Sequence, residues 1–132
     1  MKGIYFLIIS ISKGSTVKIG ALGSILFEKG SYVYVGSAMN GLENRINRHL
    51  REEKKMHWHI DYLLASENAK IARVFVKETS DKKEECRIAG KIAKIGTPVQ
   101  DFGCGDCRCT THLFRIGADF NTLTGFSEFR SL

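Results

Sequence analysis

An apolar stretch at residues 3–11 places the strongest constraint on how this chain can fold. It reads Gly-Ile-Tyr-Phe-Leu-Ile-Ile-Ser-Ile, and it is rich in β-branched and aromatic side chains. A strand with one solvated face alternates apolar and polar residues, whereas an almost unbroken apolar run is typical of a strand covered on both faces. We therefore expect residues 3–11 to form a central strand, with other elements packed on both sides of it.

The rest of the chain carries the signals of a mixed fold. Short β-prone stretches bounded by glycine or polar residues predict strands at residues 16–19, 24–27, 32–36, 71–76 and 113–116. The period becomes helical from Leu42, and a short second helix is expected around Ile60. Asp81 and Glu84 have capping-box spacing, which predicts a helix from Asp81 to Ile95. We expect an α+β fold, a small antiparallel or mixed sheet flanked by helices.

Length predicts the domain organisation. A chain of 132 residues suits one domain, here residues 1–132. Residues 14–30 are interpreted as an inserted hairpin, and a cysteine-rich loop is expected at residues 102–109. Residues 119–132 carry scattered aromatic side chains and form either a docked tail or a loose one.

Charge points to the class of partner. The net charge of +6 and the isoelectric point near 9.3 favour a polyanion, although a solvated lysine-rich face explains them equally well. The sequence has no apolar run long enough for a membrane span, and no signal-peptide cleavage site follows residues 4–11. We expect a cytoplasmic protein without membrane contact, whose four cysteines are reduced or metal-bound.

Residues 30–49 have the pattern of an anion-binding element. A β-prone segment closes at Gly36 and Ser37, a turn follows at residues 40–41, and a helix begins. This helix carries a group of cationic side chains: Arg45, Arg48, His49 and Arg51. Cations beside a glycine-lined backbone suit a phosphate group, and we expect the ligand to be a nucleic-acid backbone.

Several of these residues resemble a known enzyme family. Gly3-Ile4-Tyr5 and Tyr34-Val35-Gly36 resemble the two halves of the GIY-YIG nuclease signature, and Arg45 and His49 follow at the spacing of that family. His-Trp-His-Ile-Asp-Tyr at residues 57–62 and Phe-Gly-Cys-Gly-Asp-Cys-Arg-Cys at residues 102–109 look most similar to its Uri-like endonuclease branch. The resemblance covers most of residues 3–115.

The resemblance implies a metal-dependent endonuclease that hydrolyses phosphodiester bonds in DNA. Because the chain is so short, we expect it to be directed by DNA structure or damage rather than by a long sequence. It implies one Mg²⁺ or Mn²⁺ ion held by Glu85, whose position on the predicted helix faces inward. The implied catalytic residues are Tyr5, Tyr34, Arg45, His49 and Glu85, with Gly36, Ser37, Arg48 and Arg51 binding the substrate. RNA stays an alternative substrate, and a protein partner could supply targeting.

Other interpretations of the same residues remain open. The two tyrosines could belong only to the core, and His49 could be a half-buried helix residue. Glu78 is the second choice of metal ligand. The tyrosines lie farther apart than in most family members, and the asparagine that follows the family's glutamate is missing, with Asp101 or Asp106 as substitutes. A non-catalytic nucleic-acid-binding module is therefore the alternative function.

The cysteine-rich loop supports a separate hypothesis. Its cysteines and a nearby histidine could bind a structural zinc ion in a zinc-stabilised adaptor, or the loop could simply be reduced. The residues of this zinc hypothesis are Cys104, Cys107, Cys109 and His112. Residues 57–61 form another cluster, in which Trp58 could stack on a base or anchor the core.

Overall fold

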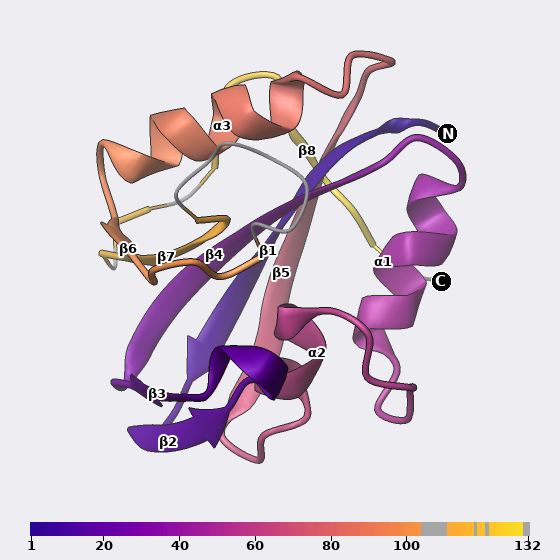
Figure 1. Ribbon diagram of the computed structural model, residues 1–132. Coiled ribbons are helices and arrows are strands. Elements are labelled where there is room, and N and C mark those ends of the chain that lie inside the picture. Colours follow the sequence, from indigo (N-terminus) through magenta and orange to yellow (C-terminus); the bar gives the residue numbers. More distant parts are fainter. Residues whose placement is uncertain (104–110, 118, 121, 131–132) are drawn as a thin grey trace.

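The computed structural model describes residues 1–103, 111–117, 119–120 and 122–130. Its main element is a six-stranded sheet in the order β6-β7-β4-β1-β5-β8, in which every neighbouring pair is antiparallel. The strands are β1 (Gly3–Ile11), β4 (Gly30–Ala38), β5 (Ala69–Glu78), β6 (Thr97–Pro98), β7 (Leu113–Ile116) and β8 (Ser127–Glu128). Helices cover both faces of the sheet (Figure 1), which confirms the predicted α+β fold.

Strand β1 is central, as its apolar sequence predicts. It pairs with β4 along one side and with β5 along the other, and of its residues only Ser10 is exposed. Tyr5, Leu7 and Ile9 enter one hydrophobic cluster, while the alternate side chains enter a second cluster on the opposite face. The period of two along a strand thus distributes one apolar run between two cores.

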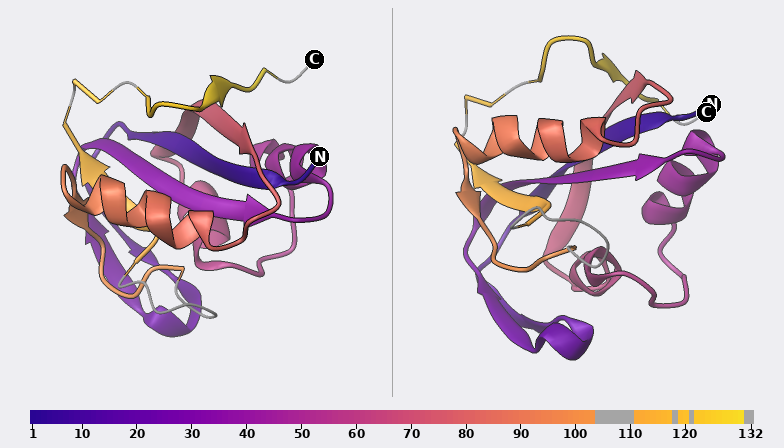
Figure 2. Two further views of the ribbon diagram at one scale, coloured as in Figure 1. Left: turned by 90° about the horizontal axis from the view of Figure 1, so that it is seen from above. Right: turned by 45° about the horizontal axis from the view of Figure 1, so that its top comes forward.

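The helices divide between these two faces (Figure 2). Helices α1 (Leu42–Leu50) and α2 (His59–Leu64) contribute apolar residues to the cluster that contains Tyr5. Helix α3 (Glu84–Ala93) contributes to the cluster on the opposite face. It begins three residues later than predicted, because the carboxylate of Asp81 accepts a hydrogen bond from the Lys83 amide in a turn that precedes the helix.

The chain between β1 and β4 forms the expected hairpin. Strands β2 (Ser15–Lys18) and β3 (Ser24–Phe27) make a separate two-stranded sheet, joined by the short 3₁₀ helix η1 (Gly20–Leu22). Ile19 and Phe27 are almost fully buried, and the hairpin contacts α2. It therefore completes the core on the α1–α2 face and leaves β1 and β4 paired directly.

The C-terminal segment is docked through its described residues. Phe120, Leu123 and Phe126 pack against the cluster beneath α3, and β8 adds to the edge of the sheet beside β5. The two-residue strands β6 and β8 were not predicted, because so short a segment shows no period. No helix of the described chain combines the length and the apolar character required to cross a membrane.

Candidate active site

The candidate site lies at the end of β4, just beyond the residues that pair with β7. Paired residues of the two strands run from Ser31 to Tyr34, and one further hydrogen bond of 2.9 Å joins the Val35 amide to the His112 carbonyl. Beyond this point, β4 continues through Gly36 to Ala38 and pairs with β1. Side chains from both faces of the sheet meet at this end of β4.

Tyr5 is the buried centre of the α1 side. Its side chain is 1% exposed, and its hydroxyl shares a hydrogen bond of 2.7 Å with Nε2 of His49. Gly36 is its direct partner in the β1–β4 pairing. A Cβ added to Gly36 would lie 2.5 Å from the Tyr5 ring and hydroxyl, so only glycine leaves room for the phenol.

His49 is held in its neutral form. The pKa of its imidazole is lowered to about 3, chiefly by burial and also by the nearby cations Lys54, Arg48 and Arg45, against the opposing effect of Asp61. Its Nδ1 atom is buried and has no hydrogen-bond partner in the described part of the chain. A neutral imidazole of this kind orients the phenol through their hydrogen bond.

Arg45 is aimed at the same point from α1. One of its NH groups donates a hydrogen bond of 3.1 Å to the carbonyl of Ser37, and the guanidinium also hydrogen-bonds the Tyr5 hydroxyl. Its Cζ atom lies 4.6 Å from the centre of the Trp58 ring. Burial raises the pKa of the Tyr5 phenol, and the charge and hydrogen bond of Arg45 act against that rise by favouring the phenolate.

Glu85 approaches from α3, on the opposite face of the sheet. Its Oε1 accepts a hydrogen bond from the Ser37 hydroxyl, and its Oε2 lies 2.7 Å from Nδ1 of His112. Burial alone would raise the pKa of this carboxyl, but the hydrogen bonds from His112 and Ser37 outweigh burial and lower it. Glu85 is therefore an ionised carboxylate whose side chain is 18% exposed.

Ser37 links the two sides of the site. Its carbonyl accepts a hydrogen bond from Arg45, and its hydroxyl donates one to Glu85. A cation from α1 and an anion from α3 are thus fixed by one residue at the end of β4. Such an arrangement can bind an anionic group through the arginine, with a carboxylate next to the bound group.

The remaining predicted residues have different surroundings. The Tyr34 ring meets the His49 ring edge-on at 6.2 Å, and its hydroxyl has no hydrogen-bond partner among the described residues. Arg48 is engaged by Asp61 through two hydrogen bonds of 2.9 Å. Arg51 is exposed just after α1 and makes no ion pair within the described chain. The structure brings Tyr5, Tyr34, Arg45 and His49 together, whereas the Arg48 guanidinium is paired with Asp61.

The chemistry of the donor set fits one hard cation. Among the described residues, no group of three or more His, Cys, Asp or Glu side chains is arranged to hold a metal. Mg²⁺ does not need such a group, because it is commonly bound by one or two carboxylates and keeps water and phosphate oxygens as its other ligands. The ionised carboxylate of Glu85 and the hydroxyl of Ser37 supply oxygen ligands of this kind.

The structure tests the predictions about the cysteines only in part. Cys104, Cys107 and Cys109 lie outside the described residues. His112 is described, and its Nδ1 faces the Glu85 carboxylate and the Val35 carbonyl, a role that the zinc hypothesis did not foresee. Cys86 is disulfide-bonded, so the expectation that all four cysteines are reduced or metal-bound was wrong. That expectation came from the assumed compartment, which does not decide whether a particular thiol is paired.

Trp58 and Asp61 were not predicted to belong to the candidate site. In the structure, the Trp58 ring contacts both Arg45 and Arg48, and Asp61 is the fully buried partner of Arg48. The usable signal was the position of Asp61 three residues after Trp58, where a carboxylate can bond the free amides at a helix start.

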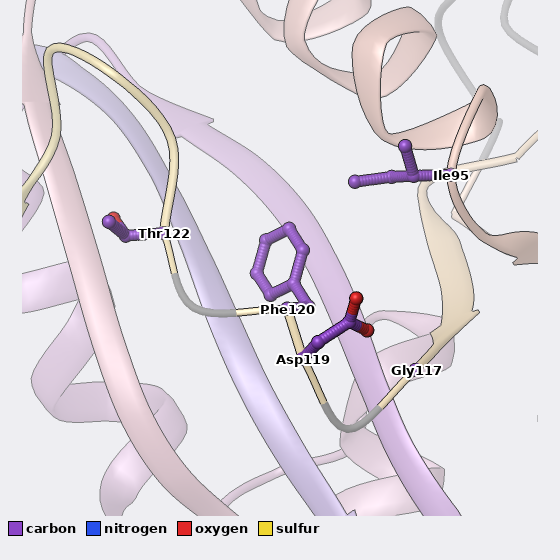
Figure 3. A pocket seen from close by; sticks show the side chains of 5 residues that line it. All are labelled: Ile95, Gly117, Asp119, Phe120 and Thr122. Carbon is purple, nitrogen blue, oxygen red and sulfur yellow. The ribbon is translucent and has the colours of Figure 1, made fainter.

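An open cavity of about 340 Å³ lies elsewhere, near the C-terminal end of α3 (Figure 3). Its lining residues are Ile95, Gly117, Asp119, Phe120 and Thr122. Glu85 lies in the first turn of α3 and Ile95 lies just after its last residue. The cavity is therefore separated from the candidate site by the length of that helix.

Comparisons with known proteins give one positive result. No curated protein and no solved structure matches the chain. A family model described as a domain of unknown function matches residues 4–130, and this span includes Tyr5, Arg45 and Glu85. The chain therefore belongs to the DUF123 family.

Proposed function

We propose that this protein is a GIY-YIG-type endonuclease that hydrolyses phosphodiester bonds in DNA with the help of one Mg²⁺ or Mn²⁺ ion. The observation that carries the proposal is the convergence of Arg45 and Glu85 on Ser37, beside the hydrogen-bonded pair of Tyr5 and His49. The order of these residues along the chain resembles that of the nuclease family, and their geometry supports the same chemistry.

Arg45 binds the scissile phosphate in this proposal. Only one of its NH groups is donated to Ser37, and its charge lies at the end of β4 rather than in an ion pair with a described carboxylate. A guanidinium fork matches two phosphate oxygens and stabilises the charge that develops on them during attack. Glu85 would hold the divalent ion, which supplies charge neutralisation at the phosphoryl group.

In this proposal Tyr5, oriented by His49, takes up the proton of the attacking water. Water forms a new bond to phosphorus and the P–O bond to the leaving oxygen breaks, so one proton must leave the water and one must reach the leaving oxygen, which departs as an alcohol. Burial keeps Tyr5 protonated and His49 neutral in the free protein, and His49 orients the Tyr5 hydroxyl through their hydrogen bond. The charge of Arg45 favours the phenolate, and a divalent ion held beside it would favour it further, so that Tyr5 could take up the proton of the water. Tyr34 closes the apolar side of this pair through its ring contact with His49.

One observation favours the alternative, a nucleic-acid-binding module without catalysis. Both carboxylate oxygens of Glu85 already have protein partners, namely Ser37 and His112. If these contacts prevent a metal ion from binding Glu85, the site only binds phosphate.

The test is nicking of supercoiled plasmid and of branched DNA, with Mg²⁺, with Mn²⁺ and with EDTA. We expect metal-dependent cleavage by the wild type and a loss of about 10²–10³-fold in rate for Glu85→Gln and for Arg45→Ala. Glu52→Gln removes an exposed carboxylate outside the helices and should cleave like the wild type.

Two results separate the candidates. Equal cleavage by the wild type and Glu85→Gln would point to a contaminating nuclease and remove the assignment. Metal-independent binding of DNA by the wild type, with no cleavage of any substrate, would select the non-catalytic module.

A further inference from the structure

Trp58 packs against the core cluster that contains Tyr5, and it also lies beside Arg45. The residue precedes α2 and is half-buried. The Cζ atoms of Arg45 and Arg48 lie over its ring, 4.6 Å and 4.4 Å from the ring centre. At these distances a guanidinium is attracted to the face of an indole ring, and the attraction grows as the pair is desolvated.

Asp61 fixes the backbone of Trp58 and the side chain of Arg48 at the same time. Its carboxylate is fully buried, and it accepts bonds of 2.9 Å from two NH groups of Arg48 and from the backbone amides of His57 and Trp58. Burial raises the pKa of this carboxyl, but these hydrogen bonds together lower it below its ordinary value. Asp61 is therefore a satisfied buried anion that holds the backbone of Trp58 in place.

Arg48 is positioned as a support and not as a ligand for DNA. Besides its two bonds to Asp61, it donates a hydrogen bond of 2.9 Å to the carbonyl of Lys55. Its charge is balanced by the buried carboxylate. This leaves the guanidinium of Arg45 as the cation of this group that reaches Ser37 and Tyr5.

We propose that Asp61, Arg48 and Trp58 form a positioning unit that holds the Arg45 guanidinium against the end of β4. A free arginine side chain populates many rotamers, and ordering it on binding lowers affinity. Trp58 on one side and Ser37 on the other remove that disorder before the ligand arrives. The inference rests on the proposed function, since it assigns to Arg45 the phosphate of a nucleic acid.

The first test is a double-mutant cycle on DNA binding. Binding of a fluorescein-labelled DNA duplex is measured in EDTA, so that cleavage does not interfere, for Trp58→Leu, Arg45→Ala and the double variant. We expect Trp58→Leu to weaken binding about tenfold, the size of one partly desolvated cation–π contact. The double variant should bind no more weakly than Arg45→Ala alone, because Trp58 acts through Arg45.

Trp58→Phe is the conservative variant and should retain most of the affinity, because it keeps an aromatic face for the guanidinium. Losses that add in the double variant would overturn the inference, since they would mean that Trp58 contacts the DNA itself.

The second test needs no nucleic acid. Arginine side-chain Nε–Hε signals are recorded by NMR for ¹⁵N-labelled wild type, Trp58→Leu and Asp61→Asn. We expect the ring-current shift of the Arg45 signal to disappear in Trp58→Leu and to shrink in Asp61→Asn, while the signal of exposed Arg51 stays in place. Arg48→Met, which keeps the apolar stem, serves as the second variant if Asp61→Asn does not fold by circular dichroism.

An Arg45 signal that does not move in the folded variants would overturn the positioning unit, whatever the nuclease assay shows. A signal that moves as expected in a protein that neither binds nor cleaves DNA would support the unit and contradict the proposed function.

Discussion

At the scale of single residues, the absence of a Cβ at Gly36 determines where the Tyr5 phenol lies. An alanine there would place its Cβ 2.5 Å from the Tyr5 ring. We predict that Gly36→Ala lowers the free energy of unfolding by about 1–3 kcal/mol, the usual cost of overpacking. Chemical denaturation measures this change.

Gly90→Ala is the matched control. Gly90 lies in α3, and an added Cβ would have no atom within 4 Å. That substitution should stabilise the protein by about 0.5–1 kcal/mol, because glycine is a poor helix former. A Gly36→Ala protein as stable as the wild type would show that Tyr5 is free to move aside.

The buried imidazole of His49 predicts a pH dependence of stability. Its pKa in the folded protein is about 3, below the ordinary 6.5, so the unfolded chain takes up the proton first as the pH falls. Stability is therefore lost as the pH falls below 6.5, by about 2 kcal/mol between pH 7 and pH 5 for this residue alone. Asp61 and Glu85 have lowered pKa values and titrate below this window.

The measurement is urea denaturation at several pH values for the wild type and His49→Gln. The variant should lose this part of the slope between pH 7 and pH 5. A slope that is the same in both proteins would mean that His49 is accessible to protons in the folded state.

Spacing along the chain could predict which residues carry the candidate site, but not how each of them is used. Arg45 and Glu85 were placed by their positions on predicted helices, and both meet at Ser37. Arg48 was expected to bind substrate, yet it donates to Asp61, a residue thirteen positions away. Such a pairing depends on the angle between α1 and α2, which no local pattern specifies.

At the scale of secondary-structure elements, the hairpin β2–β3 contributes more to the core than its place between β1 and β4 suggests. Phe27 is 1% exposed and Leu26 is 66% exposed, although they are neighbours on β3. We predict that Phe27→Ala lowers the free energy of unfolding by about 3–5 kcal/mol.

Leu26→Ala should change the stability by no more than about 0.5 kcal/mol. Thermal or chemical unfolding of the two variants measures the difference. If both substitutions changed the free energy of unfolding only slightly, the hairpin would contribute little to the stability of the core. It could then be deleted without loss of the fold.

Long elements were predicted well and short ones were not. The apolar run 3–11 became β1 with the expected bounds, and the helical period from Leu42 became α1. The start of α3 was wrong by three residues, because Asp81 bonds a backbone amide before the helix instead of capping it. Strands β6 and β8 form by pairing with β7 and β5, and two residues are too few to show a strand pattern in the sequence.

At the scale of the whole molecule, the net charge of +6 predicts salt-sensitive binding to DNA. Each phosphate contact releases about one counterion, so Arg45→Gln should reduce the slope of log K against log salt by about one. Lys13→Gln should leave the slope unchanged, because Lys13 lies just beyond Ile11, at the end of β1 away from Tyr5. Fluorescence anisotropy across a salt series measures both slopes. Equal slopes for the two variants would place the DNA away from Arg45.

The close approach of Tyr5 to Gly36 also bears on how the protein folds. Strands β1 and β4 must find each other across the intervening hairpin, and a sliding error of one residue would turn every side chain of β4 to the wrong face. A slip of two residues would keep the faces but set Tyr34 or Ala38 against the phenol, where a Cβ leaves no room. The glycine therefore selects one alignment of the two strands. The same Tyr5–Gly36 pair that forms part of the candidate site also fixes the register of the sheet.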